Sequence, residues 1–228
     1  GQAMKVVMLD DQGAYLRDAG IDEVGVLAIS GPNVFAGYRV EAQNHGLWID
    51  RQDGRRWLNT GDLGRQDAQG YFWLTGRKKE LIIRGGHNID PGSIEEPLHR
   101  HPAVQVAAAV GRPDAHAGEL PVAYVQLKAG ATISESELLA FARNEISERA
   151  AVPRYIRIIP TMPLTGVGKI FKPALKLMEA EAAVRDALSE AGLTPVEVSA
   201  RDDKQLGLVA RVVFASADDT GQARTVLG

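Results

Sequence analysis

The sequence has no cysteine, so it carries neither a disulfide framework nor a thiolate metal site. It also lacks a run of roughly 18 uninterrupted apolar residues, the length that a membrane-spanning helix needs. No block of like charges occurs, and the formal net charge is only -3. These absences exclude a disulfide-stapled scaffold and argue against nucleic acid or an anionic membrane as the main partner. They favour a cytoplasmic protein with no membrane span.

The residues that are present have ordinary globular proportions, with 45% hydrophobic and 24% charged residues in a chain of 228. This length suits one large domain or two smaller ones. The first residues lack the basic and then apolar profile of a signal peptide. A strand-like run over residues 4–9 leads directly into a turn instead. We therefore expect the chain to begin inside a larger protein.

The chain divides into an all-β stretch, a mixed stretch and a tail. Short strand patterns over residues 5–9, 24–29 and 71–74, separated by Gly, Asp, Asn and Pro, predict a small barrel or a strongly bent sheet. From about residue 80 to 170, strand and helix patterns alternate, which predicts a compact α+β unit. The helices there are expected to start at Asp90, as an N-cap, and at Ser134, which forms a capping box with Glu137.

Asp62 lies in the segment Asn59-Thr60-Gly61-Asp62-Leu63. An acidic side chain held in a tight turn can accept both hydroxyls of a ribose, as in dinucleotide sites. Taken alone, Thr-Gly-Asp is more often a turn stabilised by its own side chains, without a ligand. The segment alone therefore predicts a turn.

The segment from Thr75 to Asp90 contains Arg77 and the pair Gly85-Gly86. Arg77 could hold a ribose or phosphate oxygen with its fixed donor fork. Glycines without a Cβ would let a ligand pass close to the backbone. The competing interpretation is a basic turn, an edge strand and a glycine hairpin, and by itself this interpretation is favoured.

Lys169 follows two glycines in the segment Pro163-Leu164-Thr165-Gly166-Val167-Gly168-Lys169. A lysine on such a loop places a point charge where an anionic intermediate could be met. It is not a phosphate-binding P-loop, because the required earlier glycine and the following Ser or Thr are missing. A lone loop lysine is usually a solvated surface residue. None of the five histidines has the spacing of a metal site, so no metal ligand is assigned.

The order and spacing of these segments, from about Gly1 to Lys176, resemble the adenylate-forming superfamily, which includes acyl-CoA synthetases, peptide-synthetase adenylation domains and luciferases. The resemblance is carried by the following motifs: Gly31-Pro32-Asn33-Val34-Phe35-Ala36-Gly37-Tyr38, Trp57-Leu58-Asn59-Thr60-Gly61-Asp62-Leu63, Gly70-Tyr71-Phe72-Trp73-Leu74-Thr75-Gly76-Arg77, the stretch 85–96, Gly118-Glu119-Leu120-Pro121-Val122-Ala123-Tyr124-Val125 and the stretch 163–169. So many motifs in register are highly specific.

The resemblance implies a two-step reaction. A carboxylate attacks the α-phosphate of Mg-ATP to give acyl-AMP and pyrophosphate, and the thiol of CoA then displaces AMP. It implies that Asp62 binds the ribose diol, that Arg77 contacts the nucleotide and that Lys169 is the catalytic lysine of adenylation. ATP, Mg and CoA are thus the implied substrates and cofactors, together with a small-molecule carboxylic acid.

The resemblance also implies a mobile small domain. Lys79 occupies its hinge position, and the Gly85-Gly86 loop lines the pantetheine passage after the domain has swung. The expected division is a β-rich end of the AMP-binding domain over residues 1–78, a mobile domain over 79–176 and an appended helix-strand-strand-helix tail over 177–228.

Several consequences follow from the resemblance. The family's phosphate loop, adenine segment, magnesium-binding glutamate and acyl pocket are expected upstream of Gly1, so this stretch alone is expected to be inactive and to bind no cofactor. Asn88 stands where related synthetases often carry a basic residue, which weakens any phosphate contact there. The Ile-Phe-Lys-Pro that follows Lys169 favours a CoA ligase.

Two other interpretations remain open. The protein could be an acyl-AMP ligase that passes the acyl group to a carrier protein. It could also be a non-catalytic assembly module that uses its tail, and a tail of this kind suggests a homodimer.

Overall fold

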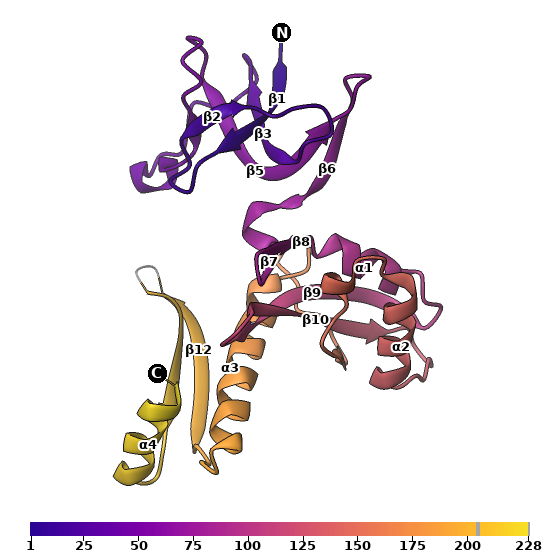
Figure 1. The fold of residues 1–228 in the computed structure, drawn as a ribbon, viewed down its shortest axis with the longest axis vertical. Helices are drawn as coiled ribbons and strands as arrows, with labels where there is room; N and C mark the ends of the chain where they lie inside the picture. The colour runs from indigo at the N-terminus through magenta and orange to yellow at the C-terminus, as the bar shows by residue number, and fades with distance from the viewer. Residues whose placement is uncertain (204–205, 228) are drawn as a thin grey trace. The chain divides into compact units, whose positions relative to one another are not determined.

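The computed structural model describes residues 1–203 and 206–227 of the chain. The structure contains two compact units, Gly1–Leu81 and Ile82–Gly228. The first unit is all β apart from two short 3-10 turns, and the second combines strands with helices (Figure 1). The α+β class expected from the sequence is confirmed.

The first unit is one six-stranded antiparallel sheet with the order β2-β1-β3-β5-β4, and β6 also pairs with β5. Among its described strands no pairing closes the sheet into a barrel, so the predicted barrel is an open sheet. The elements are β1 Ala3–Leu9, β2 Tyr15–Asp18, β3 Gly25–Ser30, η1 Glu41–Asn44, β4 Trp48–Ile49, β5 Trp57–Gln66, β6 Phe72–Arg77 and η2 Lys78–Glu80.

The apolar core of this sheet is small, and the guanidinium group of Arg51 packs against it. Val7, Ala28 and Trp57 are almost completely buried. The Arg51 guanidinium lies over the Trp57 ring, with its carbon 4.6 Å from the centroid, and pairs with Asp18 at 2.6 Å. A cation on an aromatic face is stabilising when it is desolvated, as Arg51 largely is. The contact therefore adds to the packing of a sheet that has few buried apolar residues.

The second unit is a sheet with helices on both faces. Its order is β11-β10-β7-β8, with β9 on the other side of β10. Alternate residues of β9 serve opposite faces: Ala107 and Ala109 contact the helices α1 and α2, whereas Ala108 and Val110 pack with α3. The elements are β7 Ile82–Arg84, β8 His87–Ile89, α1 Gly92–His99, β9 Val104–Asp114, β10 Gly118–Leu127, α2 Glu135–Glu145, η3 Arg149–Ala151, β11 Ile156–Ile158 and α3 Lys172–Glu190.

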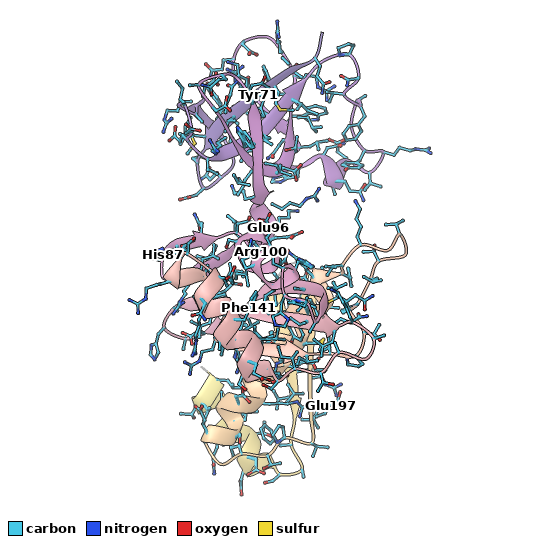
Figure 2. The ribbon with its side chains drawn as sticks, turned by 90° about the vertical axis from the view of Figure 1, so that its right-hand side faces the viewer. Tyr71, His87, Glu96, Arg100, Phe141 and Glu197 are labelled. Carbon is cyan, nitrogen blue, oxygen red and sulfur yellow. The ribbon has the colours of Figure 1, made fainter. Side chains whose placement is uncertain are left out.

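The two helices on one face also contact each other. Arg100, at the end of α1, pairs with Glu145 of α2 at 3.1 Å, and the rings of His101 and Phe141 meet edge to face with their centroids 4.8 Å apart. Figure 2 labels Arg100 and Phe141. The capping box of α2 is present, because Ser134 accepts a hydrogen bond from the Glu137 N–H and Glu137 returns one. These contacts make the face a single packed layer.

The start of α1 differs from the sequence prediction. Its N-cap residue is Pro91, already in the helical conformation with φ -53° and ψ -33°, and no side chain caps the helix. Asp90 instead interacts with the backbone N–H of Gly92. The helix thus begins one residue later than predicted, although Pro91 already has helical dihedral angles, which suit the fixed φ of proline.

The remaining chain packs along α3. This helix passes through residues 176 and 177 without a break and ends at Glu190; Gly192, just beyond the C-cap residue Ala191, has φ +75°. The hairpin β12 Glu197–Asp203 and β13 Gly207–Val213 lies beside α3, and α4 Ala217–Leu227 closes a small core with Leu188 and Leu193 (Figure 1). The domain limits and a homodimer through the tail stay predictions. No helix in the described part of the chain has the length and hydrophobicity to cross a membrane.

Candidate active site

Asp62 and Arg77, the two residues predicted to bind nucleotide, are brought together by strand pairing. They are cross-strand partners on β5 and β6, and Arg77 Nε lies 3.0 Å from Asp62 Oδ1. The Arg77 side chain is 65% exposed and that of Asp62 is 27% exposed. An accessible carboxylate beside a guanidinium offers acceptors for hydroxyls and donors for a phosphate or ribose oxygen.

A bulge in β5 sets the direction of Asp62. Val26 pairs with Leu63 and Ala28 with Asn59, so three residues of β5 oppose only Leu27 of β3. Gly61 has φ +73°, which favours glycine, and the Thr60 hydroxyl donates to the Leu27 carbonyl at 2.8 Å. The sequence predicted a turn here, but the segment lies inside a long strand. Bulges commonly redirect a side chain beside a functional site.

Lys79 lies in the 3-10 turn Lys78–Glu80, shortly before the last residue of the first unit, Leu81. The preceding residue, Arg77, is extended and Leu81 has ψ 139°, so the turn is a short helical link between extended segments. A change of dihedral angles here would move one unit as a body, which is what a hinge requires.

Gly85 and Gly86 form the two-residue turn of the β7–β8 hairpin, in which Arg84 pairs with His87. Their φ values are +53° and +86°. A two-residue turn with positive φ at both central positions is the type I′ turn that favours right-twisted hairpins. A Cβ at either glycine would meet no atom within 4 Å. Glycine at these two positions therefore adopts the positive φ values of the turn without strain and leaves open space beside the backbone.

Lys169 follows a tight hairpin tip. The Gly168 N–H donates to the Thr165 carbonyl at 2.8 Å, the Thr165 N–H donates to the Lys169 carbonyl at 2.7 Å, and Gly168 has φ +80°. This is the three-residue hairpin loop whose last residue is left-handed, a position that glycine fills without strain. Leu164 and Ile170 form a bridge below the tip, and the Lys169 residue is exposed to solvent. The motif thus presents the ammonium group outward.

An ion pair lies directly after this tip. Lys172 Nζ, in the first turn of α3, is 2.9 Å from Glu95 Oε1 of α1, and both side chains are less than a fifth exposed. The same oxygen accepts the Ala109 N–H of β9 at 2.8 Å. Burial raises the pKa of nearby Asp90, the Gly92 N–H opposes this rise, and the charge of Glu95 adds to it. Lys172 was not among the predicted site residues, and only its position next to the lysine motif could have suggested it.

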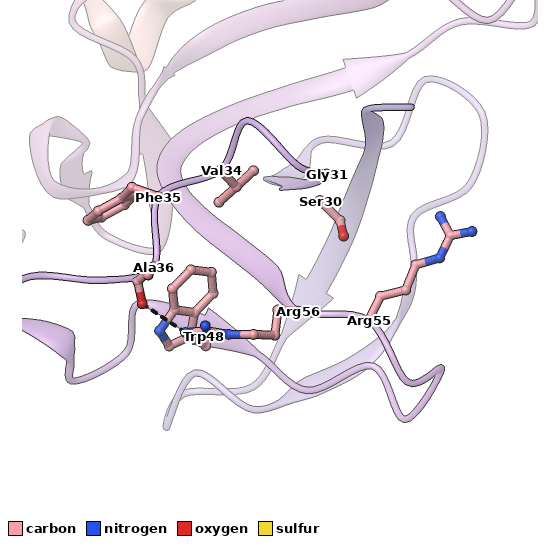
Figure 3. A pocket seen from close by; sticks show the side chains of 8 residues that line it. All are labelled: Ser30, Gly31, Val34, Phe35, Ala36, Trp48, Arg55 and Arg56. Atoms are coloured by element: carbon pink, nitrogen blue, oxygen red, sulfur yellow. Dashed lines mark hydrogen bonds between the residues drawn. The ribbon is translucent and has the colours of Figure 1, made fainter.

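A hollow of about 340 Å³ lies in the first unit (Figure 3). Arg56 stacks on Trp48, with 3.9 Å from the guanidinium carbon to the ring centroid, and donates to the Ala36 carbonyl at 3.1 Å. The hollow is lined by Ser30, Gly31, Val34, Phe35, Ala36, Trp48, Arg55 and Arg56. None of the predicted site residues contributes to it.

Comparison with known proteins places these motifs in one family. The AMP-binding enzyme C-terminal domain matches residues 93–169, which end at Lys169. The chain is 47% identical over 223 residues to the marinolic acid–CoA ligase of a Pseudoalteromonas species, covering 97% of this chain and 34% of that protein. It is 39% identical over 159 residues to the long-chain-fatty-acid–CoA ligase of Bacillus subtilis, covering 70% of this chain and 28% of that protein. The chain thus spans about a third of the length of these relatives.

Solved structures agree with the sequence relatives. ATP-bound MatB from Rhodopseudomonas palustris matches with a TM-score of 0.67 and 28% identity, over 77% of this chain and 33% of that one. The o-succinylbenzoate CoA synthetase of Bacillus subtilis, in complex with its acyl-adenylate intermediate, matches with a TM-score of 0.65 and 28% identity over 76% of this chain and 34% of that one. The chain therefore belongs to the adenylate-forming, AMP-binding enzyme family and carries that family's C-terminal domain.

Proposed function

We propose that the chain is part of an ATP-dependent acyl-CoA synthetase, in which Lys169 is the catalytic lysine of the adenylation step. The observation that carries the proposal is the exposed Lys169 at the end of a glycine-built tip, within a domain whose relatives are CoA ligases. A cytoplasmic location, where ATP and CoA are available, belongs to the same proposal.

In the first step the substrate carboxylate attacks the α-phosphorus of Mg-ATP, the bond to the β-phosphate oxygen breaks, and pyrophosphate leaves. Negative charge collects on the carboxylate and phosphoryl oxygens. Catalysis of phosphoryl and nucleotidyl transfer depends mainly on positioning and on cations at these oxygens. Lys169 supplies such a cation, and Asp62 and Arg77 hold the ribose and an adjoining oxygen of the nucleotide.

In the second step the CoA sulfur attacks the acyl carbon, AMP leaves, and the thiol proton is released. Lys169 has no part in this step. The mobile domain turns about Lys79. Gly85 and Gly86 then line the path of the pantetheine arm, which passes through the open space beside them. In this proposal one small domain, over residues 79–176, serves two steps in turn, with a short link absorbing the rotation.

The test measures the two half-reactions separately in the full-length enzyme. Lys169→Ala should slow pyrophosphate release by about a hundredfold to a thousandfold or more, the usual effect of losing one group that stabilises the developing charge. Thioester formation from preformed acyl-AMP should be nearly unchanged. Lys128→Ala is the matched control, because Lys128 is also an exposed lysine of the second unit, bonded to the Pro102 carbonyl.

Two results would overturn the proposal. Equal losses in both half-reactions would remove Lys169 from the adenylation step. Accumulation of acyl-AMP without any thioester in the presence of CoA would show that CoA is not the acceptor.

A further inference from the structure

The second unit contains one fully buried carboxylate that the proposed mechanism does not use. Glu179, in the middle of α3, is 0% exposed and is the only charged side chain among the described residues to be buried. Buried carboxylates are costly unless they are paired and hydrogen-bonded. The contacts of Glu179 therefore show what this carboxylate does in the fold.

Four side chains converge on Glu179, three from strands of the sheet and one, Tyr155, from the residue before β11. Its Oε1 accepts a hydrogen bond from the Tyr124 hydroxyl at 2.5 Å and lies 3.2 Å from Arg157 Nε. Its Oε2 accepts from the Tyr155 hydroxyl and lies 3.4 Å from Arg112 Nη1. Arg112 belongs to β9, Tyr124 to β10 and Arg157 to β11. One helix residue is thus bound to three neighbouring strands.

The same face of α3 makes the other contacts with the sheet. Leu175, one turn before Glu179, is fully buried against Val110, Val122 and Tyr124. Asp186, two turns after Glu179, pairs with Arg112 Nη2 at 2.5 Å. Burial and the hydrogen bond to Glu179 both raise the pKa of the Tyr124 hydroxyl, which keeps it a donor to the carboxylate. Hydrogen bonds to a charged acceptor have stricter geometry than apolar contacts, so they fix the height and rotation of α3 on the sheet.

The position of α3 decides where Lys169 emerges. Only Ile170 and Phe171 separate Lys169 from the first residue of the helix, and the Phe171 N–H donates to the Pro163 carbonyl at the base of the tip. Displacing α3 along or about its axis would displace the lysine by a similar distance. A misplacement of about 1 Å can cost up to a hundredfold in rate.

We propose that Glu179 is a positioning residue for the catalytic lysine: its carboxylate docks α3 on the sheet and so sets the position of Lys169 for adenylation. The inference rests on the proposed function of Lys169. It assigns a role in the chemistry to the stretch after residue 176, which was predicted to be an appended tail.

The test uses the full-length enzyme at a temperature at which thermal unfolding shows every variant to be folded. Glu179→Gln keeps the shape and removes the charge, and Tyr155→Phe removes a single donor. Glu190→Gln, an exposed carboxylate at the end of the same helix, is the matched control. Leu188→Ala, in the small core between α3 and α4, lowers stability without touching the Glu179 contacts. For each variant, kcat and KM for ATP are measured in adenylation, and the rate of thioester formation from preformed acyl-AMP is measured separately.

We expect Glu179→Gln to lower the kcat of adenylation about tenfold or more, with little change in KM for ATP and a thioester rate within about twofold of the wild type. Tyr155→Phe should also lower the kcat of adenylation while leaving the thioester rate nearly unchanged, but the loss in kcat should be smaller. Leu188→Ala should lower the melting temperature without separating the half-reactions, and Glu190→Gln should change neither.

An unchanged adenylation rate in Glu179→Gln, or equal losses in both half-reactions, would overturn the inference. If Glu179→Gln does not fold, Tyr155→Phe decides the question by the same criterion. Lys169→Ala separates the two proposals. If that variant loses adenylation while the Glu179 and Tyr155 variants keep it, only the positioning role fails.

Discussion

Asp62 and Arg77 face each other across β5 and β6, with 3.0 Å between the carboxylate and the guanidinium Nε. The bulge opposite Leu27 and the left-handed Gly61 put Asp62 in register with Arg77. Asp62 and Arg77, which lie in two segments that each predicted a turn, thus form one accessible pair of opposite charges. A nucleotide held by both would use the carboxylate for its hydroxyls and the guanidinium for its oxygens.

Asp62→Asn in the full-length enzyme should raise the KM for ATP about tenfold to a hundredfold, because a hydrogen bond to a charged group contributes about 1.5–3 kcal/mol. The kcat of adenylation should fall much less. Asp22→Asn is the control, since Asp22 forms another exposed pair, with Arg65, in the same unit. A lower melting temperature with an unchanged KM would show that the Asp62–Arg77 pair is only structural.

Gly86→Ala should slow thioester formation more than adenylation. The added methyl group meets no protein atom within 4 Å, so the direct cost is the backbone strain at φ +86°, about 1–2 kcal/mol. Gly130→Ala is a matched control, because Gly130 has φ +78° and equally open surroundings in the same unit. If both variants affect the two half-reactions alike, Gly86 does not line the pantetheine passage.

Tyr124 should make stability depend on alkaline pH. Burial and the Glu179 carboxylate raise the pKa of Tyr124 in the folded state, whereas an unfolded tyrosine titrates near about 10. The stabilising contribution is therefore complete below about pH 10 and falls as the pH rises toward the folded pKa, by up to about 1.4 kcal/mol per pH unit.

Tyr124→Phe should be less stable than the wild type below pH 10, and the difference should narrow above it. Urea unfolding at several pH values measures this difference, with the exposed Tyr71→Phe as the control. A difference that stays constant from pH 8 to 11 would contradict the raised pKa.

Local features were predicted well from the sequence. The capping box of Ser134 and Glu137 and the glycine hairpin at Gly85 and Gly86 are present. Each depends on hydrogen bonds or dihedral angles within a few residues, which side-chain chemistry alone can fix. Asp90 was predicted as the N-cap, one residue before the observed cap Pro91, because the end of a helix is defined only to within one or two residues and Pro91 is itself already helical.

The sequence alone determined the order of the motifs, and with it the family and the exposed lysine after Gly168. Tertiary structure alone decided that Asp62 meets Arg77 and that Glu179 is buried among Arg112, Tyr124, Tyr155 and Arg157. The first contact requires a bulge between paired strands, and the second requires a helix packed on three strands. A local pattern cannot specify such contacts, because their partners lie far apart in the chain and meet only when the core forms.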